Sequence, residues 1–283
     1  MKTSHNPSDT IATRMDFIVL FDALDCNPNG DPDANNAPRQ DPETMQGLVS
    51  NVCLKRKVRN YINMKFQEEK GHRIYIQQGS ALNNTFAEAM KKKPAGMSDG
   101  EAMCMEFYDV RAFGAVFTQS QESKQAQGPV QFTWARSFDP ITPFDHAIVR
   151  CCVAKEEKST DGSNKASMPG RQQGLAYGLY KFMVTVNPFL AEKTGFTYAD
   201  LGELIEAIEK MFYLDQASSR GNMCVRKMYL IEHDSPFGSI EAQKLSELVK
   251  ATPLTETPRA FSDYQVSMDK DSLPAGVSVT EII

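Results

Sequence analysis

The clearest apolar signal in the chain is an unbroken run, Phe17–Phe21. A strand with one face in water alternates apolar and polar residues, so an unbroken run predicts a strand buried on both faces, at the centre of a sheet. Alternation does appear at Val130, Phe132 and Trp134, which places these three side chains on one face of a strand over residues 128–139. Further strands are expected over residues 73–77, 147–154, 182–186 and 225–232.

Apolar residues three and four apart predict a helix from residues 47–50 to about Glu69. Five apolar residues can share its buried side: Leu48, Val52, Val58, Ile62 and Phe66. Asn51, Lys55 and Arg59, four apart, then form the opposite stripe. A second amphipathic helix is expected over residues 201–212, and shorter ones over residues 81–93, 99–108 and 240–249.

The elements follow the order strand, helix, strand, excursion, strand, hairpin, strand, helix, strand. The excursion covers residues 80–127 and has no predicted core of its own. The hairpin covers residues 141–172 and holds Asp161-Gly162, a hairpin turn signal. Without these two insertions the order approximates β-α-β-β-α-β, the ferredoxin-like unit shared by RNA-recognition folds. We therefore predict an α+β fold in which residues 1–283 form a single RRM-like domain.

Composition fits a soluble globular protein, with 41% apolar and 24% charged residues among 283. No apolar run approaches the roughly 20 residues of a membrane helix. Residues 1–14 lack the apolar core of a signal peptide, so we expect a cytoplasmic protein with no membrane partner. The six cysteines include no Cys-x-x-Cys pair, which favours reduced thiols in that compartment.

Charge is unevenly distributed along the chain. The net charge of −5 counts against a simple basic nucleic-acid binder. Two local clusters remain, four cations within Lys55–Arg59 and three in Lys91–Lys93. The second precedes Pro94, where cations suit the negative end of a helix dipole, so it is the weaker indication of binding.

The first basic cluster suits phosphate. The helix start offers free backbone N–H groups, the Ser50 hydroxyl and the Asn51 amide, an anion site by geometry. Lys55 and Arg59 follow one and two turns along. A solvated helix face is the usual interpretation of a charge run, but residues 46–67 contain no acid, which weakens it here.

The loop before this helix has two other interpretations. Asp25-x-Asn27-x-Asn29-Gly30 matches the opening of an EF-hand calcium loop. Position twelve is Asn36 instead of the required glutamate, and a strand precedes the loop where a helix belongs, so a chance match is the better interpretation. Four carboxylates crowd the same loop and allow a metal or general-base site, although aspartate beside proline and glycine is ordinary in turns. These carboxylates are Asp25, Asp31, Asp33 and Asp41.

The same region resembles a known family. The segments that carry the resemblance are residues 27–33, 37–42, 53–60, 109–117 and 128–137. Together they resemble the backbone (Cas-seven-type) subunit of type I-C CRISPR Cascade, a member of the repeat-associated RNA-binding (RAMP) superfamily. The likeness spans about Asp16 to Phe237, and the tail after Ser262 carries no recognisable signal.

The resemblance implies a hand-like antiviral defence protein without a cofactor. A ferredoxin-like palm would carry a helical fingers insertion at residues 80–127 and a β-hairpin thumb at residues 141–172. Copies would stack as a filament along one crRNA, in a ribonucleoprotein complex with other Cascade subunits. The guide bases would then remain free to pair with a target DNA strand.

The resemblance also implies roles for particular residues. In relatives the basic helix contacts the guide backbone, which carries over to Lys55, Arg56 and Arg59. Position and chemistry extend the expected RNA-binding set to Asn27, Asn29, Arg39, Arg111, Arg136 and Arg171, beside Ser50 and Asn51 at the helix start.

One departure concerns catalysis. Type III relatives carry an RNA-cleaving aspartate in this loop, and the matching position here is Asn36. An amide cannot act as a base or hold a metal as a carboxylate does, so we expect a scaffold that is not an enzyme. The alternative is a metal-dependent endoribonuclease that uses Asp31 or Asp33.

Overall fold

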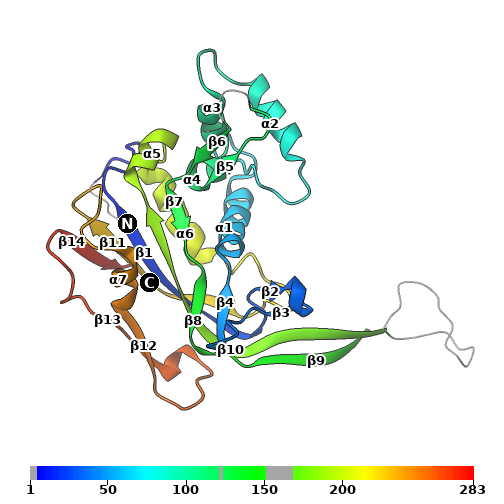
Figure 1. Cartoon of the computed structure of the whole chain (residues 1–283). Coiled ribbons are helices and arrows are strands. Elements are labelled where there is room, and N and C mark those ends of the chain that lie inside the picture. Colours follow the sequence, from blue (N-terminus) through cyan, green and yellow to red (C-terminus); the bar gives the residue numbers. More distant parts are fainter. Residues whose placement is uncertain (1–4, 121–123, 151–167) are drawn as a thin grey trace, which may run out of the picture.

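The computed structural model describes residues 5–120, 124–150 and 168–283. Its centre is an eight-stranded sheet in which every pairing is antiparallel. The main path runs β14-β11-β1-β10-β8-β4, while β7 and β9 also pair with β10 (Figure 1). The strands are β1 (Met15–Cys26), β4 (Gln46–Val49), β7 (Val130–Phe132), β8 (Ala135–Pro140), β9 (Pro143–Arg150), β10 (Met168–Val186), β11 (Met223–His233) and β14 (Val277–Glu281).

The prediction for Phe17–Phe21 is confirmed, because β1 lies between β10 and β11 and these residues are fully buried. Alternate β1 residues face opposite layers, so both faces of the strand must be apolar. Phe17 and Phe21 belong to one core cluster, and Ile18 and Leu20 to another.

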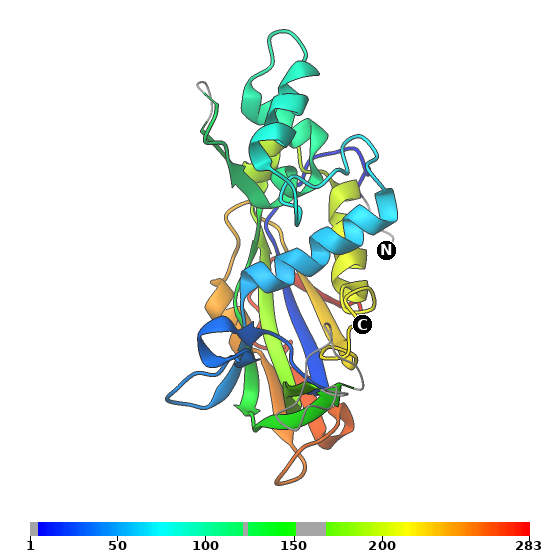
Figure 2. The same ribbon diagram turned by 90° about the vertical axis from the view of Figure 1, so that its right-hand side faces the viewer.

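Helices α1 (Asn51–Phe66) and α6 (Tyr198–Lys210) cover one face of the sheet (Figure 2). Both were predicted. The other face is covered by α7 (Ala242–Glu247) and by the hairpin of β12 (Val249–Pro253) and β13 (Tyr264–Met268). Two further short helices are α5 (Pro188–Thr194) and the 3-10 helix η2 (Phe261–Asp263). No helix in the described ranges is long and apolar enough to cross a membrane.

The 80–127 excursion is mainly helical. It contains α2 (Leu82–Lys91), α3 (Asp99–Glu106), α4 (Tyr108–Phe113), β5 (Gly114–Val116) and β6 (Gln125–Gln127). The expectation that it lacks a core is wrong, because Phe86, Met103, Phe107 and Phe117 form a small separate cluster. The strand expected over residues 73–77 is also wrong: only an isolated bridge joins Arg73 to Phe107.

The predicted hairpin is present as an antiparallel pair of β9 and β10, running from Leu175↔Pro143 to Met168↔Arg150. It projects from the sheet as a two-stranded arm (Figure 1). The turn signal Asp161-Gly162 lies outside the described residues. β10 continues for 19 residues, so one strand forms both half of the arm and a central part of the sheet.

The expected face of Trp134 is wrong. Phe132 pairs with Val184 and Arg136 with Lys181, so the 132–136 segment holds one residue more than the strand opposite. An extra residue of this kind reverses the alternation beyond it. Trp134 is therefore 49% exposed, while Phe132 is buried.

Candidate nucleic-acid interface

The loop between β1 and α1 is fixed by its asparagines. The Asn29 side-chain oxygen accepts hydrogen bonds from the Ser50 backbone N–H at 2.9 Å and from its hydroxyl at 3.0 Å. Ser50 Oγ in turn accepts from Cys53 N and caps α1. Ser50 is buried. Its hydroxyl and the Asn29 amide, both expected to bind RNA, therefore hold the loop on the helix start.

Asn27 has a similar role further back in the loop. Its side-chain nitrogen donates to the Asn36 carbonyl at 2.6 Å, and its backbone N–H donates to Ser219 O. Asn36 adopts the left-handed conformation, with φ of 63°, which asparagine tolerates. A Cβ on Gly30 would lie 2.0 Å from Asn36 Oδ1, so the loop closes tightly on this glycine. The small β2 (Gly30–Asp31), β3 (Ala37–Pro38) and 3-10 helix η1 (Pro32–Ala34) lie here.

The stripe expected on α1 is displaced by one residue. Its solvent-facing stripe consists of Val52, Arg56, Asn60 and Met64, and Lys65 is exposed beside it. Val52, expected in the core, is 66% exposed, whereas Lys55 is buried. Arg56 is the exposed cation of the expected set on this helix, and it donates to Gln78. Asn51, at the first helical position, is half-buried and its side chain accepts from Val52 N.

Lys55 is a buried cation, and no carboxylate of the described residues pairs with it. Its Nζ donates to the neutral Gln131 Oε1 at 3.0 Å and lies 5.1 Å from the centre of the Phe113 ring. Burial, with a smaller repulsion from Arg59, lowers the pKa of the Lys55 ammonium to about 8. Gln131 and Phe113 were not predicted as site residues, because neither a neutral amide nor a phenylalanine signals charge recognition in a sequence.

Arg59 also lies against this ring, with its guanidinium carbon 5.1 Å from the ring centre. Its Nε donates to Asp109 at 2.8 Å. Asp109 also accepts from the backbone of Tyr75 and Ile76 and is fully buried. The Nε of Arg59 is thus held in an ion pair. Its two terminal nitrogens, Nη1 and Nη2, make no hydrogen bond to the described residues.

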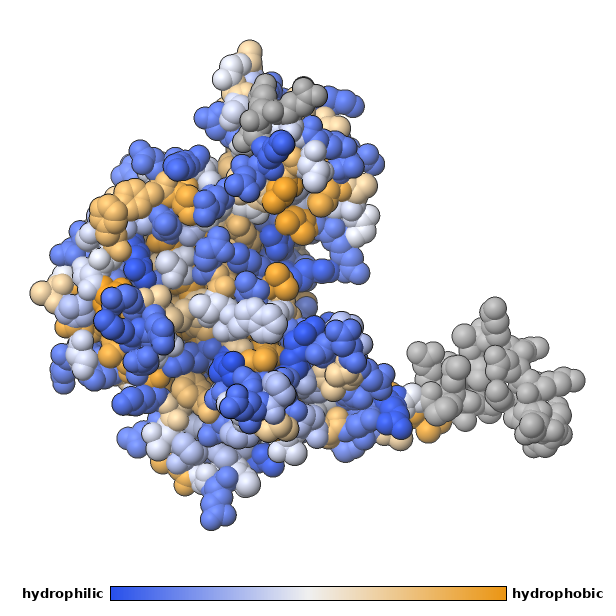
Figure 3. Space-filling view, in the orientation of Figure 1, coloured by the Kyte–Doolittle hydropathy of each residue, from blue (hydrophilic) through white to orange (hydrophobic). Residues whose placement is uncertain are grey.

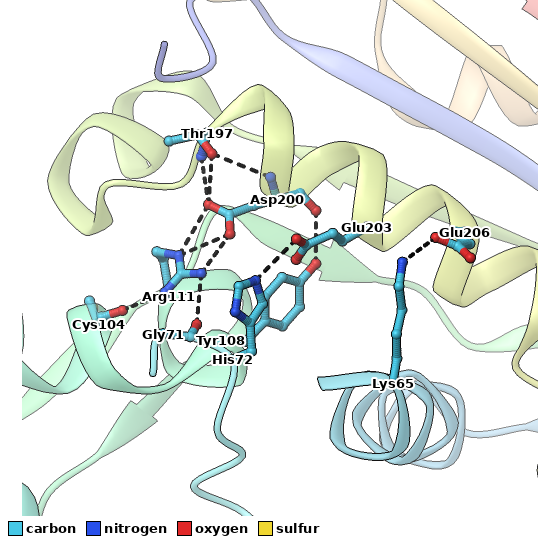
Figure 4. Close-up of polar contacts among 10 residues, drawn as sticks. All are labelled: Lys65, Gly71, His72, Cys104, Tyr108, Arg111, Thr197, Asp200, Glu203 and Glu206. Carbon is cyan, nitrogen blue, oxygen red and sulfur yellow. Dashed lines mark hydrogen bonds and ion pairs between the residues drawn. The ribbon is translucent and has the colours of Figure 1, made fainter. Parts of the chain in front are cut away.

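Arg111, expected to contact RNA, makes its hydrogen bonds inside the protein (Figure 4). It binds both Asp200 oxygens, at 2.6 to 3.2 Å, and donates to the carbonyls of Cys104 and Gly71. Asp200 also closes the N-terminal capping box of α6 with Thr197. Arg111 therefore joins α4 to α6, with Nε and Nη2 bound to Asp200 and Nη1 bound to one carbonyl.

The remaining predicted arginines are paired near the surface. Arg39 lies 3.5 Å from Asp31, and its Nε is buried without a hydrogen bond to the described residues. Arg136 binds Asp41 at 2.6 Å and holds the pKa of that carboxyl at about 2. Arg171 pairs with Asp145 across the arm and is 69% exposed.

The molecule also has an open notch (Figure 3). The space-filling view shows it between the 80–127 region and the arm, edged mainly by hydrophilic residues (Figure 3). α1 lies between the same two regions (Figure 1). The structure thus places Lys55, Arg56 and Arg59 on α1 between two projections, with Phe113 of α4 against Lys55 and Arg59.

Comparison with known proteins identifies the family. A family model described as CRISPR-associated protein Cas7 matches residues 13–269. The chain belongs to the Cas7 family. A Cas7 protein of Haloferax volcanii is 26% identical over 286 residues, which covers 92% of this chain and 82% of that protein.

A solved structure supports the Cas7-type fold. It is described as a CRISPR RNA-guided surveillance complex, pre-nicking, and is 14% identical. The match covers 77% of this chain and 78% of that one, with a TM-score of 0.50. The family resemblance inferred from the sequence is thus confirmed at the level of Cas7.

In this Cas7 chain, the carboxylates of the loop between β1 and α1 do not form a cluster. Asp31 accepts from the Asp33 backbone at 3.2 Å and faces Arg39, while Asp33 is exposed. Within the described ranges, no three histidine, cysteine, aspartate or glutamate side chains lie close enough to hold a metal ion.

Proposed function

We propose that this Cas7 chain is the crRNA-binding backbone subunit of a type I-C CRISPR Cascade complex, and that it is not an enzyme. Copies polymerise along the guide RNA in the cytoplasm, beside the other Cascade subunits. They hold phosphate and sugar and leave the bases free to pair with a target DNA strand. Sequence readout then belongs to base pairing, so the protein contacts are non-specific.

The observation that carries this proposal is the unneutralised Lys55. Burying a cation without a partner is costly, and proteins normally pair it or bind a counter-ion. Among the described residues, Lys55 contacts only a neutral amide and an aromatic ring, and Arg59 adds a second positive charge nearby. A phosphate group supplies the missing charge, and Arg56 lies exposed on the same helix to bind its neighbour.

The affinity of one copy is expected to be modest. For single strands, log K falls by about 0.7 per neutralised phosphate for each tenfold rise in salt. Three cationic contacts therefore lose about 1.3 decades between roughly 50 and 200 mM salt. Contacts between neighbouring copies supply cooperativity, which reconciles RNA binding with a net charge of −5.

The hand-like description belongs to the same proposal. The order β11-β1-β10-β8, with α1 and α6 on one face, supports a ferredoxin-like palm. We assign the fingers to residues 80–127 and the thumb to residues 141–172. The projecting β9–β10 arm supports the second assignment.

The guide-binding role is tested with the assembled complex. Lys55→Met combined with Arg56→Ala should reduce the amount of co-purifying guide for all guide sequences alike. Lys65→Met is the matched control, since it removes a lysine at the far end of α1 that pairs with Glu206. Guide loss confined to particular sequences, or equal loss in the control, contradicts the proposal.

The absence of catalysis is tested separately. The alternative is a metal-dependent endoribonuclease that uses Asp31 or Asp33. The complex is incubated with complementary RNA and Mg²⁺, and the RNA should remain intact. Regularly spaced fragments that disappear in an Asp33→Asn variant would establish the alternative.

A further inference from the structure

A second recognition surface lies on the opposite face of the sheet from α1. It is a cavity of about 500 Å³ between β8, β10 and α7. Its walls include Trp134, Arg136, Phe138, Lys181 and Gln243. None of the described residues that line it is an aspartate or glutamate.

Trp134 is the only tryptophan of the chain. The extra residue between Phe132 and Arg136 turns it away from the helix-covered core. Half of its surface remains exposed, at 49%. A large planar ring held at the mouth of a cavity is a stacking surface for another planar group.

Two cations face each other beside this ring. Arg136 and Lys181 are paired across β8 and β10, and like charges in such pairs are unfavourable. Lys181 Nζ lies 5.2 Å from the centre of the Phe138 ring and donates to the carbonyls of Ser246 and Val249. A negative group bound between the two cations would relieve their repulsion.

Arg136 keeps donors available for such a group. Its contacts with Asp41, Thr44 and Gln46 all use Nη1. Nε and Nη2 make no hydrogen bond to the described residues, and the side chain is 48% exposed. Asp41 neutralises part of the charge and fixes the guanidinium at the edge of the cavity.

We propose that this cavity binds a nucleotide of an unpaired nucleic-acid strand, with the base stacked on Trp134 and the phosphate between Arg136 and Lys181. The site is separate from α1 and does not depend on Lys55. Stacking tolerates every base, and the two cations bind phosphate without reading sequence. The surface therefore holds a single strand of any sequence.

Tryptophan fluorescence tests the proposal directly, because the chain has a single tryptophan. Titration of the purified protein with short oligouridine at low salt should quench Trp134 emission to saturation. Inorganic phosphate alone should leave the emission unchanged. An emission unaffected by oligouridine at millimolar concentration overturns the proposal.

Two sets of variants separate this site from the guide interface. In a Lys55→Met background, Trp134→Leu should weaken binding of labelled oligouridine by about 5-fold or more, because an apolar side chain without a ring cannot stack. Trp134→Phe, which keeps a ring, should weaken it less. Arg136→Gln should shift the quenching curve to higher concentration, and Arg136→Lys should recover part of the shift.

The Lys55→Met protein also distinguishes a failure of the cavity proposal from a failure of the α1 proposal. Quenching that persists in this variant assigns the strand to Trp134, whatever the variant does to guide retention. Quenching that disappears with Lys55→Met, or equal binding by Trp134→Leu and Trp134→Phe, overturns the cavity proposal and leaves the α1 proposal intact.

Discussion

Replacing Lys55 by methionine should stabilise the RNA-free protein while it removes guide binding. The folded structure lowers the pKa of Lys55 from 10.5 to about 8, chiefly through burial. A lysine that binds its proton less tightly when folded favours the unfolded state at every pH below 8. Methionine has a similar stem and fills the same apolar environment without this cost.

The magnitude follows from that pKa difference. Taken in full it corresponds to about 3 kcal/mol, since each tenfold change in proton affinity is worth about 1.4 kcal/mol. Nearby water screens part of it, and the Lys55→Met change removes the hydrogen bond to Gln131, worth about 1 kcal/mol. The expected net gain at pH 7 is about 1–2 kcal/mol, or about 2–8 °C in Tm.

Urea denaturation of wild type, Lys55→Met and the Lys65→Met control measures this gain. The sign of its pH dependence is fixed: the advantage is full below pH 8 and shrinks between pH 8 and 10.5, because folded Lys55 is then already neutral. A Lys55→Met protein that is less stable than wild type at pH 7 refutes the assignment of Lys55 as an unneutralised cation.

Three further predictions concern the same interface and its supports. Guide retention should be constant below about pH 8 and decline above it, because phosphate requires protonated Lys55; a Lys55→Arg complex, measured by filter binding, should show no such decline. Arg111→Met should lower the free energy of unfolding by about 3–5 kcal/mol, because it leaves the buried Asp200 carboxylate without its cation; a loss below about 1 kcal/mol in chemical denaturation contradicts this role. Gly30→Ala should reduce guide retention, because its Cβ would meet Asn36 Oδ1, and adding Asn36→Gly should restore it.

The parts of the fold that local pattern determines were predictable. Phe17–Phe21 reads as a central strand because both sheet faces require apolar residues there. The β9–β10 arm was expected from its strand signals on either side of a turn. The order of the main strands and of the two long helices follows from the same local signals.

The α1 register was not predictable from the sequence. A lysine stem packs against an aromatic ring as readily as a valine does, so the pattern does not reveal that Lys55 is buried and Val52 exposed. The ring involved, Phe113, lies in a different segment of the chain. Only the tertiary contact distinguishes the two registers.

The ion pairs were hidden for a related reason. Arg111 and Asp200 lie 89 residues apart in sequence, and Arg59 and Asp109 lie 50 apart. A charged residue read alone looks available for a ligand. The predicted face of Trp134 was wrong for a different reason. A single extra residue reverses which face the later side chains occupy, and the sequence pattern does not show where that residue is inserted.

The continuity of β10 constrains how this protein can change over evolutionary time. Its 19 residues span about 60 Å in one extended strand. One part of the strand is fixed in the central sheet, and the other part extends beyond it in the arm. Inserting or deleting one residue near the point where the strand leaves the sheet would turn every later side chain to the wrong side, far from the edit. Insertions and deletions among homologues should therefore accumulate at the outer end of the arm. The number of residues in the part of β10 that lies in the sheet should stay constant.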